Sequence, residues 1–233
     1  MKGQLLWVSI ILNVLFIIAG FLLVQRLGGF SYLWYRYKVK NRPVLYDHRT
    51  NQFELLPMDS NSLVFLGNSL TEQGEWKEFF PGAPIKNRGI SGDMTGGVYR
   101  RLKPILSAKP EKIFLMIGVN DLLFKSVDAT FEQYEKIVEE ILEKSPKTSL
   151  YLQSLLPVNN KVRYTGLENE IIIELNHKIE QLAVEKKLTY IHLYPLFLDQ
   201  YGQLDVKYTL DGVHINGEGY LKWKAAIEPM IRF

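Results

Sequence analysis

The 233-residue sequence contains no cysteine. This absence excludes a disulfide framework, a thiolate nucleophile and a zinc site built on cysteine ligands. It assigns no compartment, because exported proteins can also fold without disulfides.

A marked excess of one charge is also missing, since 28 lysines and arginines face 25 aspartates and glutamates, for a net charge of +3. Proteins that bind the phosphate backbone of nucleic acids normally show a concentrated basic face, so we expect no nucleic-acid partner. The length and a hydrophobic content of 47% suit one medium-sized globular domain with a short appendage.

Ionisable side chains are absent from residues 5–24, which read LLWVSIILNVLFIIAGFLLV. At about 1.5 Å per residue, such a helix covers roughly the 30 Å hydrocarbon core of a bilayer. A cleaved signal peptide is the alternative, but this apolar run is longer than usual, and Gln25, Arg26 and Leu27 do not form a small-residue cleavage site. We predict a single-pass N-terminal membrane anchor over residues 1–27, with residues 5–24 in the lipid bilayer.

The side of the membrane that the rest of the chain occupies follows less directly from the sequence. Five cations lie between the apolar run and the first acidic residue, Asp47: Arg26, Arg36, Lys38, Lys40 and Arg42; only Lys2 and the amino terminus precede the run. The positive-inside rule then favours a cytoplasmic C-terminal domain. The mixture of aromatics and cations in residues 31–42 is typical of a segment at the lipid headgroups, or of a solvated linker. We assign residues 28–58 to a juxtamembrane linker, and interpret residues 43–56 as a small hairpin.

From about residue 44 onward, short apolar runs alternate with longer amphipathic stretches. The expected strands are Ser62–Leu66, Pro84–Asn87, Lys112–Ile117, Ser149–Gln153 and Tyr190–Leu193. The expected helices are Met94–Ala108, Thr130–Lys144, Leu167–Lys187 and Gly217–Met230. This alternation favours an α/β fold with a parallel sheet covered on both faces, because parallel strands need crossover connections. Ligands of such folds bind at the carboxyl ends of the strands.

The first strand runs into Gly67, Asn68 and Ser69, directly before a helix. A serine on this turn is exposed, and the partial positive charge of a helix start can stabilise an oxyanion. The alternative is that Ser69 only caps the helix. This segment alone leaves both interpretations open.

Two further segments follow the second and third strands. Residues 86–97 read KNRGISGDMTGG, and their bare backbone N–H groups can bind an anion or form a flexible turn. A Walker motif needs a lysine followed by Ser or Thr, whereas Gly97 is followed by Val98. After the third strand, Asn120 offers an N–H donor suited to an oxyanion, while we expect Asp121 to hold its loop by accepting from backbone amides.

Near the C-terminus, Asp211 and His214 lie three residues apart in a turn that contains Gly212. Serine is a weak nucleophile, so it needs a base with a pKa near 6.5 and a carboxylate that fixes the tautomer of that base. A metal site competes as an interpretation, but two ligands without a third nearby make a poor one, and we expect no metal. We expect structural roles for the remaining histidines, His48, His177 and His192.

In this order, the four segments resemble the GDSL/SGNH hydrolase family. The matching motifs are Gly67-Asn68-Ser69-Leu70, Gly89 in NRGISGD, Gly118-Val119-Asn120-Asp121 and Asp211-Gly212-Val213-His214, within residues 60 to 225. The resemblance implies a three-layer αβα sandwich on a five-stranded parallel sheet, a hydrolase domain over residues 59–233, and no metal or organic cofactor. Asn68 replaces the Asp of the GDSL motif, at a position that neighbours the nucleophile without performing its chemistry. Many members of this family are exported, so the orientation in the membrane stays open.

The resemblance also implies a role for each residue. Ser69 would attack the carbonyl of a carboxylic ester, His214 would move the protons, and Asp211 would orient His214. The N–H groups of Ser69 and Gly89 and the side-chain amide of Asn120 would form an oxyanion hole. The reaction would pass through an acyl-enzyme. One alternative is an inactive carbohydrate- or lipid-binding module, and another is a metal-requiring phosphate-binding protein that uses the loop 89–97.

The expected substrates are small-molecule esters with short acyl or acetyl groups on sugars or lipids. Candidate substrate-binding residues are Leu70, Leu123 and Val213, together with Arg163 and Tyr164 in the loop PVNNKVRYTG. Ordinary loop or packing roles are the alternative for these residues. The sequence points to no particular protein partner.

Overall fold

The computed structural model describes residues 2–26 and 44–231 and divides into two compact units, Met1–Asp47 and His48–Phe233. The cations Arg36, Lys38, Lys40 and Arg42, and the aromatic and basic segment 31–42, lie outside the described residues.

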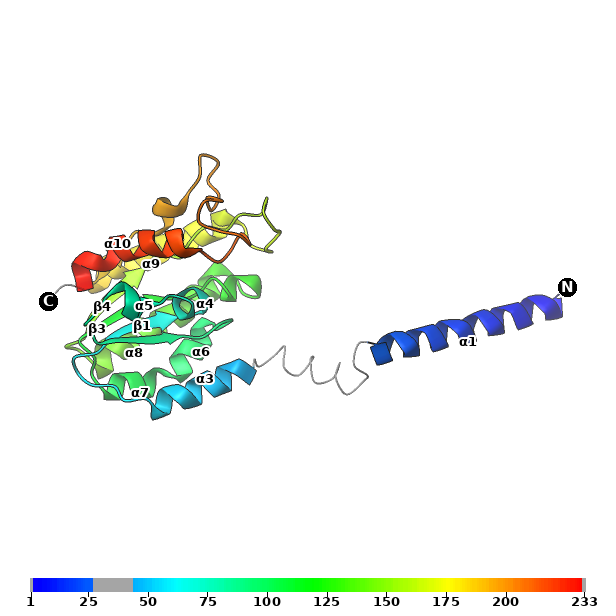
Figure 1. Ribbon diagram of the computed structural model, residues 1–233, viewed down its shortest axis with the longest axis horizontal. Helices are drawn as coiled ribbons and strands as arrows, with labels where there is room; N and C mark the ends of the chain where they lie inside the picture. The colour runs from blue at the N-terminus through cyan, green and yellow to red at the C-terminus, as the bar shows by residue number, and fades with distance from the viewer. Residues whose placement is uncertain (1, 27–43, 232–233) are drawn as a thin grey trace. The chain divides into compact units, whose positions relative to one another are not determined.

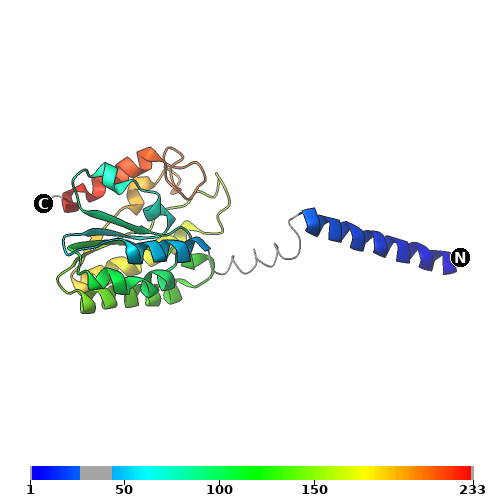
Figure 2. The same cartoon turned by 60° about the horizontal axis from the view of Figure 1, so that its bottom comes forward.

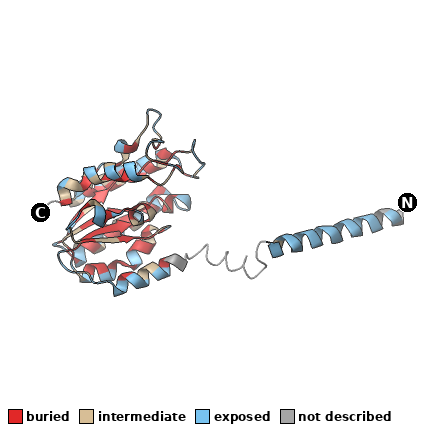
Figure 3. Ribbon diagram, viewed as in Figure 1, coloured by how far each residue is buried: buried red, intermediate tan, exposed pale blue. Residues whose placement is uncertain are grey.

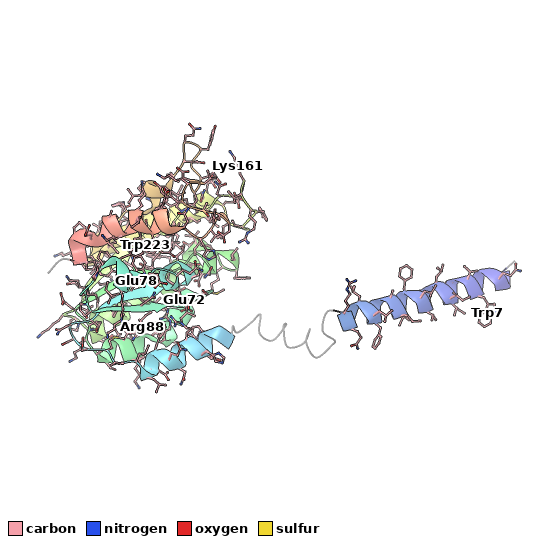
Figure 4. All side chains as sticks on the ribbon, in the orientation of Figure 1. Trp7, Glu72, Glu78, Arg88, Lys161 and Trp223 are labelled. Atoms are coloured by element: carbon pink, nitrogen blue, oxygen red, sulfur yellow. The ribbon has the colours of Figure 1, made fainter. Side chains whose placement is uncertain are left out.

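Helix α1, Lys2–Arg26, makes up the described part of the first unit before α3. Its segment Trp7–Arg26 has a mean hydropathy of 2.6, and none of these side chains is buried. Figure 3 shows no buried residue over Trp7–Arg26, and in Figure 4 the side chain of Trp7 projects from the helix. By length and composition α1 can cross a membrane, although signal sequences share these properties.

The second unit is built on one sheet of five parallel strands, in the order β2-β1-β3-β4-β5. The strands are β1 Leu63–Gly67, β2 Ile85–Gly89, β3 Lys112–Met116, β4 Ser149–Gln153 and β5 Thr189–Ile191. Gly67 pairs in register with Gly89 on one side and Met116 on the other, so the carboxyl ends of β2, β1 and β3 align. The parallel five-stranded sheet expected from the sequence is confirmed.

Helices cover both faces of this sheet, which gives three layers (Figures 1 and 2). One face carries α4 Ser69–Glu72, α5 Trp76–Phe79 and α10 Gly217–Ile231. The other face carries α6 Thr95–Arg100, α7 Leu102–Ser107, α8 Val127–Lys144 and α9 Asn169–Lys186. Two short 3₁₀ helices, η1 Asp121–Leu123 and η2 Tyr194–Phe197, lie in loops. The chain reverses its direction across the sheet at β1, the position at which such folds bind ligands.

Continuous apolar runs such as LVFL and IFLM form the strands because both faces of the sheet are buried. Phe65 of β1 stacks on Phe114 of β3 and on Trp76, with ring centroids 4.9 and 4.5 Å apart. Trp76 in turn meets Trp223 of α10, whose indole N–H donates to Gln153 Oε1 at 2.8 Å. These aromatic contacts attach the α5 and α10 layer to the sheet, and both indole N–H groups are satisfied, since that of Trp76 donates to Thr71 O at 2.8 Å.

Two expectations about the elements are wrong. The expected helix 94–108 is divided into α6 and α7, because Arg101 leaves helical geometry at φ −106° and ψ 13°. The segment interpreted as a hairpin is helix α3, Val44–Leu55. Arg49 and Phe53 are four residues apart and therefore share a helix face, and Phe53 is buried with its ring 4.7 Å from the Arg88 guanidinium. An isolated hairpin would lack this packing.

Phe53→Ala should reduce the free energy of unfolding by about 3 kcal/mol, because it removes a buried ring that packs on Arg88. Urea unfolding of a fragment that begins at residue 41 measures the change. Glu54→Ala, an exposed neighbour on α3, is the control and should stay within about 0.5 kcal/mol of wild type. Equal effects of the two substitutions would show that α3 does not pack on the domain.

Candidate active site

Ser69 is the first residue of α4, directly after β1. The N-cap is Asn68, whose Oδ1 accepts a hydrogen bond from Leu70 N at 3.1 Å. The interpretation of Ser69 as only a helix cap is therefore wrong, and its hydroxyl is left for other partners. The same bond accounts for the Asn in place of the family's Asp, since an amide oxygen accepts this N–H as a carboxylate would.

The structure brings Ser69, His214 and Asp211 together across 145 residues of sequence. Ser69 Oγ lies 3.0 Å from His214 Nε2, and His214 Nδ1 lies 2.7 Å from Asp211 Oδ2. The other Asp211 oxygen accepts from the backbone N–H groups of Val213 and His214 at 2.9 and 2.8 Å. All three side chains are half-buried, so a small molecule can reach them.

Burial alone would raise the pKa of Asp211, but the hydrogen bonds from the His214 ring and from two backbone N–H groups outweigh it and lower that pKa to about 2. The carboxylate is therefore anionic at neutral pH. It fixes the His214 proton on Nδ1, which leaves Nε2 to accept the Ser69 proton. The arrangement can thus activate a serine hydroxyl as a nucleophile.

Gly89 does not fit the predicted role of an oxyanion donor. Its N–H donates to Asn87 Oδ1 at 2.9 Å, and a Cβ at this position would lie 2.2 Å from Glu72 N. Gly89 is therefore a glycine because β2 passes close to α4. The next glycine, Gly92, has a φ of +75°, open space around its Cα, and an N–H that meets no acceptor among residues 44–231. Nothing in the sequence around Gly92 distinguishes it from Gly89 as a candidate oxyanion donor.

Asn120 lies at the end of β3, and its Nδ2 donates to the backbone carbonyl of Asp93 at 2.8 Å. This bond uses one of the two amide hydrogens, which leaves the second for another acceptor. Asp121 is fully buried and accepts from the N–H and Oγ1 of Thr95 at 2.8 and 2.7 Å. The predicted role of Asp121 in holding this loop is confirmed.

A buried ion pair between Arg101 and Asp93 holds the strand ends next to the site. The sequence pattern does not predict this pair. Arg101 Nε and Nη2 both lie 2.9 Å from Asp93 Oδ2, with each side chain about 2% exposed. The same guanidinium donates to the carbonyls of Arg88 at 2.8 Å and Gly67 at 3.0 Å. One side chain therefore ties the ends of β1 and β2 to the loop that carries Gly92.

A second link runs from α3 to the same loop, on the side where Figure 4 labels Glu72 and Arg88. Glu72 Oε2 accepts from Ser91 N at 2.8 Å and from Ser91 Oγ, while Glu72 Oε1 lies 3.0 Å from Arg49 Nε. Glu72 is three residues after Ser69 on α4. The position of the Ser91–Gly92 turn is thus fixed relative to the candidate nucleophile.

The predicted substrate-binding residues divide into two groups. Leu70 is only 4% exposed and belongs to the hydrophobic core, so its assignment to a pocket wall is wrong. Val213 is half-buried and packs against the core. Leu123, Arg163 and Tyr164 are exposed on loops.

A cavity of about 290 Å³ adjoins His214 and Asp211 of the candidate site. It is lined by Gln73, Leu210, Asp211, His214, Ile215 and Asn216. The other histidines take no part in this site, and His192 Nε2 lies 3.5 Å from Glu180 Oε1. Among residues 2–26 and 44–231, no three His, Cys, Asp or Glu side chains are placed to hold a metal ion.

The two glycines should respond differently to a methyl group. Gly89→Ala should prevent folding or cost more than about 4 kcal/mol, because its Cβ would meet the Glu72 backbone at 2.2 Å. Gly92→Ala should fold and lose about 1 to 2 kcal/mol, because it has open space but a positive φ. Denaturant unfolding of both variants measures this, and a Gly89→Ala protein as stable as Gly92→Ala contradicts it.

Asp211 should contribute to stability in a defined pH window. Because folding lowers its pKa from 3.8 to about 2, the carboxylate stabilises the folded state above about pH 4. That contribution is lost as the pH falls towards 2. The difference in Tm between wild type and Asp211→Asn should therefore shrink from pH 5 to pH 2. A constant difference would argue against the hydrogen bonds described, and Glu54→Gln is an exposed control.

Comparison with known proteins gives the site a context. The sequence model of the GDSL-like Lipase/Acylhydrolase family matches residues 65–222. Platelet-activating factor acetylhydrolase IB subunit alpha2 of Rattus norvegicus is 28% identical over 184 residues, which cover 74% of this chain and 77% of that protein. An N-acylneuraminate cytidylyltransferase of Escherichia coli O18:K1:H7 (strain RS218 / NMEC) is 26% identical over 191 residues, which cover 80% of this chain but only 43% of that protein.

A solved structure from Streptococcus pneumonia, provisionally described as a platelet activating factor, superimposes with a TM-score of 0.75 at 27% identity, covering 87% of this chain and 98% of that chain. The matched family segment spans β1 to α10 and includes Ser69, Asn120, Asp211 and His214. The chain belongs to the GDSL-like lipase/acylhydrolase family.

Proposed function

We propose that this protein is a serine esterase that hydrolyses carboxylic esters through an acyl-enzyme. The observation that carries the proposal is the unbroken hydrogen-bond chain from Asp211 through His214 to Ser69 Oγ, with distances of 2.7 and 3.0 Å. Membership of a lipase and acylhydrolase family supports hydrolysis as the reaction class. Fold alone would not assign it, because the site decides the chemistry.

In the first half-reaction, Ser69 Oγ forms a bond to the ester carbonyl carbon and its proton passes to His214 Nε2. The carbonyl oxygen takes up the negative charge of the tetrahedral intermediate. When this intermediate collapses, the bond to the alcohol oxygen breaks and Nε2 returns the proton to the leaving alcohol. Asp211 stays ionised throughout and stabilises the imidazolium that forms in between.

In the second half-reaction, water replaces the alcohol. Nε2 of His214 takes a proton from the water while its oxygen attacks the acyl carbon. Collapse breaks the bond to Ser69 Oγ, which regains its proton from Nε2, and the carboxylic acid leaves. Besides the ester and one water molecule, these steps need no further reactant to balance.

Three donors are proposed for the oxyanion: Ser69 N–H, Gly92 N–H and the free hydrogen of Asn120 Nδ2. They follow the ends of β1, β2 and β3, which are adjacent in the sheet. The N–H of Ser69 is the first of helix α4 and has no intrahelical partner, and that of Gly92 meets no acceptor among residues 44–231. Removing one such donor typically costs about 10²- to 10³-fold in rate.

We assign short acyl groups, acetyl above all, as the acyl part of the substrate. The rat relative is named an acetylhydrolase, which supports this choice. Leu123, Arg163 and Tyr164 are exposed in the loops after β3 and β4, and we propose that they contact the rest of the molecule, a sugar or a lipid. Arg163 Nη2 lies 3.8 Å from Asp211 Oδ2, beside the proposed reaction centre. We propose that α1 anchors the enzyme to a membrane.

Hydrolysis of p-nitrophenyl acetate by a fragment that begins at residue 41 tests the proposal. The buried hydrophobic side chains of the described residues all lie within residues 46–231, so this fragment retains them. Activity should persist in EDTA and fall by at least about 10³-fold in Ser69→Ala, while the exposed control Ser60→Ala should match wild type.

Two other outcomes would contradict the esterase proposal. A folded fragment without turnover on acetyl or longer-chain esters, but with ligand binding that survives Ser69→Ala, would indicate a binding module. Turnover that EDTA abolishes would favour metal-dependent chemistry.

A further inference from the structure

Exposed apolar side chains gather at the carboxyl end of the sheet. Among the described residues from His48 onward, seven large apolar side chains are more than 60% exposed: Leu55, Phe124, Tyr164, Val184, Tyr201, Val206 and Leu210. Leu55 and Val184 stand singly on helices α3 and α9. The other five lie in the loops that follow β3, β4 and β5. These are also the loops that carry Asn120, Asp211 and His214.

The three loops adjoin one another around the site. The loop after β4 approaches the loop after β3, since a Cβ on Gly166 would lie 3.4 Å from Leu123. It also approaches the loop after β5, since a Cβ on Gly212 would lie 3.5 Å from Val162. Lys161 lies 4.4 Å from the centre of the Tyr201 ring. In Figure 1 the loops after β4 and β5 project at the end of the sheet where α4 begins. We define the apolar rim as five exposed apolar side chains of these loops: Leu123, Phe124, Val162, Tyr164 and Leu210.

Hydrogen bonds hold the backbone of the rim in place. Asn160 Oδ1 accepts from Thr165 N at 3.0 Å, and its Nδ2 donates to Leu167 O at 2.7 Å. The backbone N–H of Asn159 donates to Gly212 O at 2.8 Å, which joins the loop after β4 to the loop after β5. The apolar side chains are therefore presented outward on a fixed frame. Clustered exposure of this kind marks an interaction surface, whereas single exposed side chains do not.

We propose that the apolar rim inserts into the surface of a lipid bilayer, so that the enzyme acts on esters of bilayer-resident amphiphiles. The proposal rests on the proposed esterase site, because the rim lies on the loops that carry Asn120, Asp211 and His214, and Leu210 lines the cavity beside His214. Such a surface delivers a short acyl ester on a lipid to the triad without the lipid leaving the membrane.

Three features argue for a bilayer as the occupant. The same chain carries α1, which is long and apolar enough to span a membrane. A tether gives the rim a high local concentration of bilayer, so that even a weak affinity suffices. Exposed Lys161 and Arg163 lie in the same loop as Tyr164, and cations beside aromatic side chains suit the phosphate and headgroup layer.

The lack of cysteine allows a direct test of insertion. Single cysteines replace Phe124, Leu210 or Val184 in the full chain, each carries an environment-sensitive dye, and each protein is placed in nanodiscs of phosphatidylcholine and phosphatidylglycerol. Spin-labelled phosphatidylcholine should quench the dye at positions 124 and 210 but not at 184. Quenching absent at 124 and 210, or equal at all three positions, overturns the proposal. This readout needs no turnover.

A paired activity measurement tests the link to the substrate. Phe124→Ser and Val184→Ser remove side chains that are 73% and 76% exposed, so they are matched in exposure. Both should hydrolyse p-nitrophenyl acetate like wild type. On an acetyl ester of a phospholipid in the same nanodiscs, Phe124→Ser should be about tenfold slower and Val184→Ser unchanged.

The possible failures are separable. Equal rates of the two variants on the bilayer ester, with p-nitrophenyl acetate still hydrolysed, would overturn the rim and leave the esterase intact. Dye burial at position 124 without lipid would indicate that a second copy or another protein covers the rim, which also overturns the proposal. Absence of all ester hydrolysis would refute the proposed function, while the quenching still decides whether the rim meets the bilayer.

Discussion

The geometry of the site depends on the ion pair and the hydrogen bonds made by the guanidinium of Arg101. It pairs with Asp93 and donates to the carbonyls of Gly67 and Arg88, while the Asp93 carbonyl accepts from Asn120. The ends of three neighbouring strands are therefore fixed through one buried charge. Burial raises the pKa of Asp93 and Arg101 opposes that rise, so the pair exists because each partner compensates the other's desolvation. Removing either partner leaves an uncompensated charge directly beneath the site.

The strands and the residues of the proposed triad can be picked out in the sequence because each has a local signature. The strands are short apolar runs buried on both faces, and Ser69, Asp211 and His214 occupy motifs whose spacing is characteristic. The parallel sheet then brings the ends of distant motifs to one edge, as its connections require.

The remaining features depend on side-chain directions that spacing does not encode. Gly89 and Gly92 are equivalent in the sequence, and only the structure separates them. Gly89 N–H donates to Asn87 Oδ1 and the Glu72 backbone fills the space beside its Cα, whereas Gly92 has a positive φ and open space. Leu70 turns into the core because it lies on the inner face of α4. Arg101 lies within a helical pattern, and nothing in that pattern indicates its buried ion pair with Asp93. From the sequence alone, the residues of helix α3 are interpreted as a hairpin, because the sequence does not reveal the contact of Phe53 with Arg88.

The structure thus combines a rigid base with exposed loops that carry the variable part of the function. The base places the proposed nucleophile and the proposed oxyanion donors, and the loops after β3, β4 and β5 carry exposed apolar side chains. This division lets the same chemistry serve different substrates, since the loops can change without disturbing the strand ends.

The central claim is that Ser69 is a nucleophile activated by His214. Reaction of the folded protein with a fluorophosphonate, followed by intact mass spectrometry and peptide mapping, tests it most directly, because the phosphorus forms a stable bond to an activated serine oxygen and releases fluoride. The account predicts a single adduct, located on Ser69 and absent when His214 is replaced by alanine. An unmodified protein, or an adduct on another serine, would contradict it.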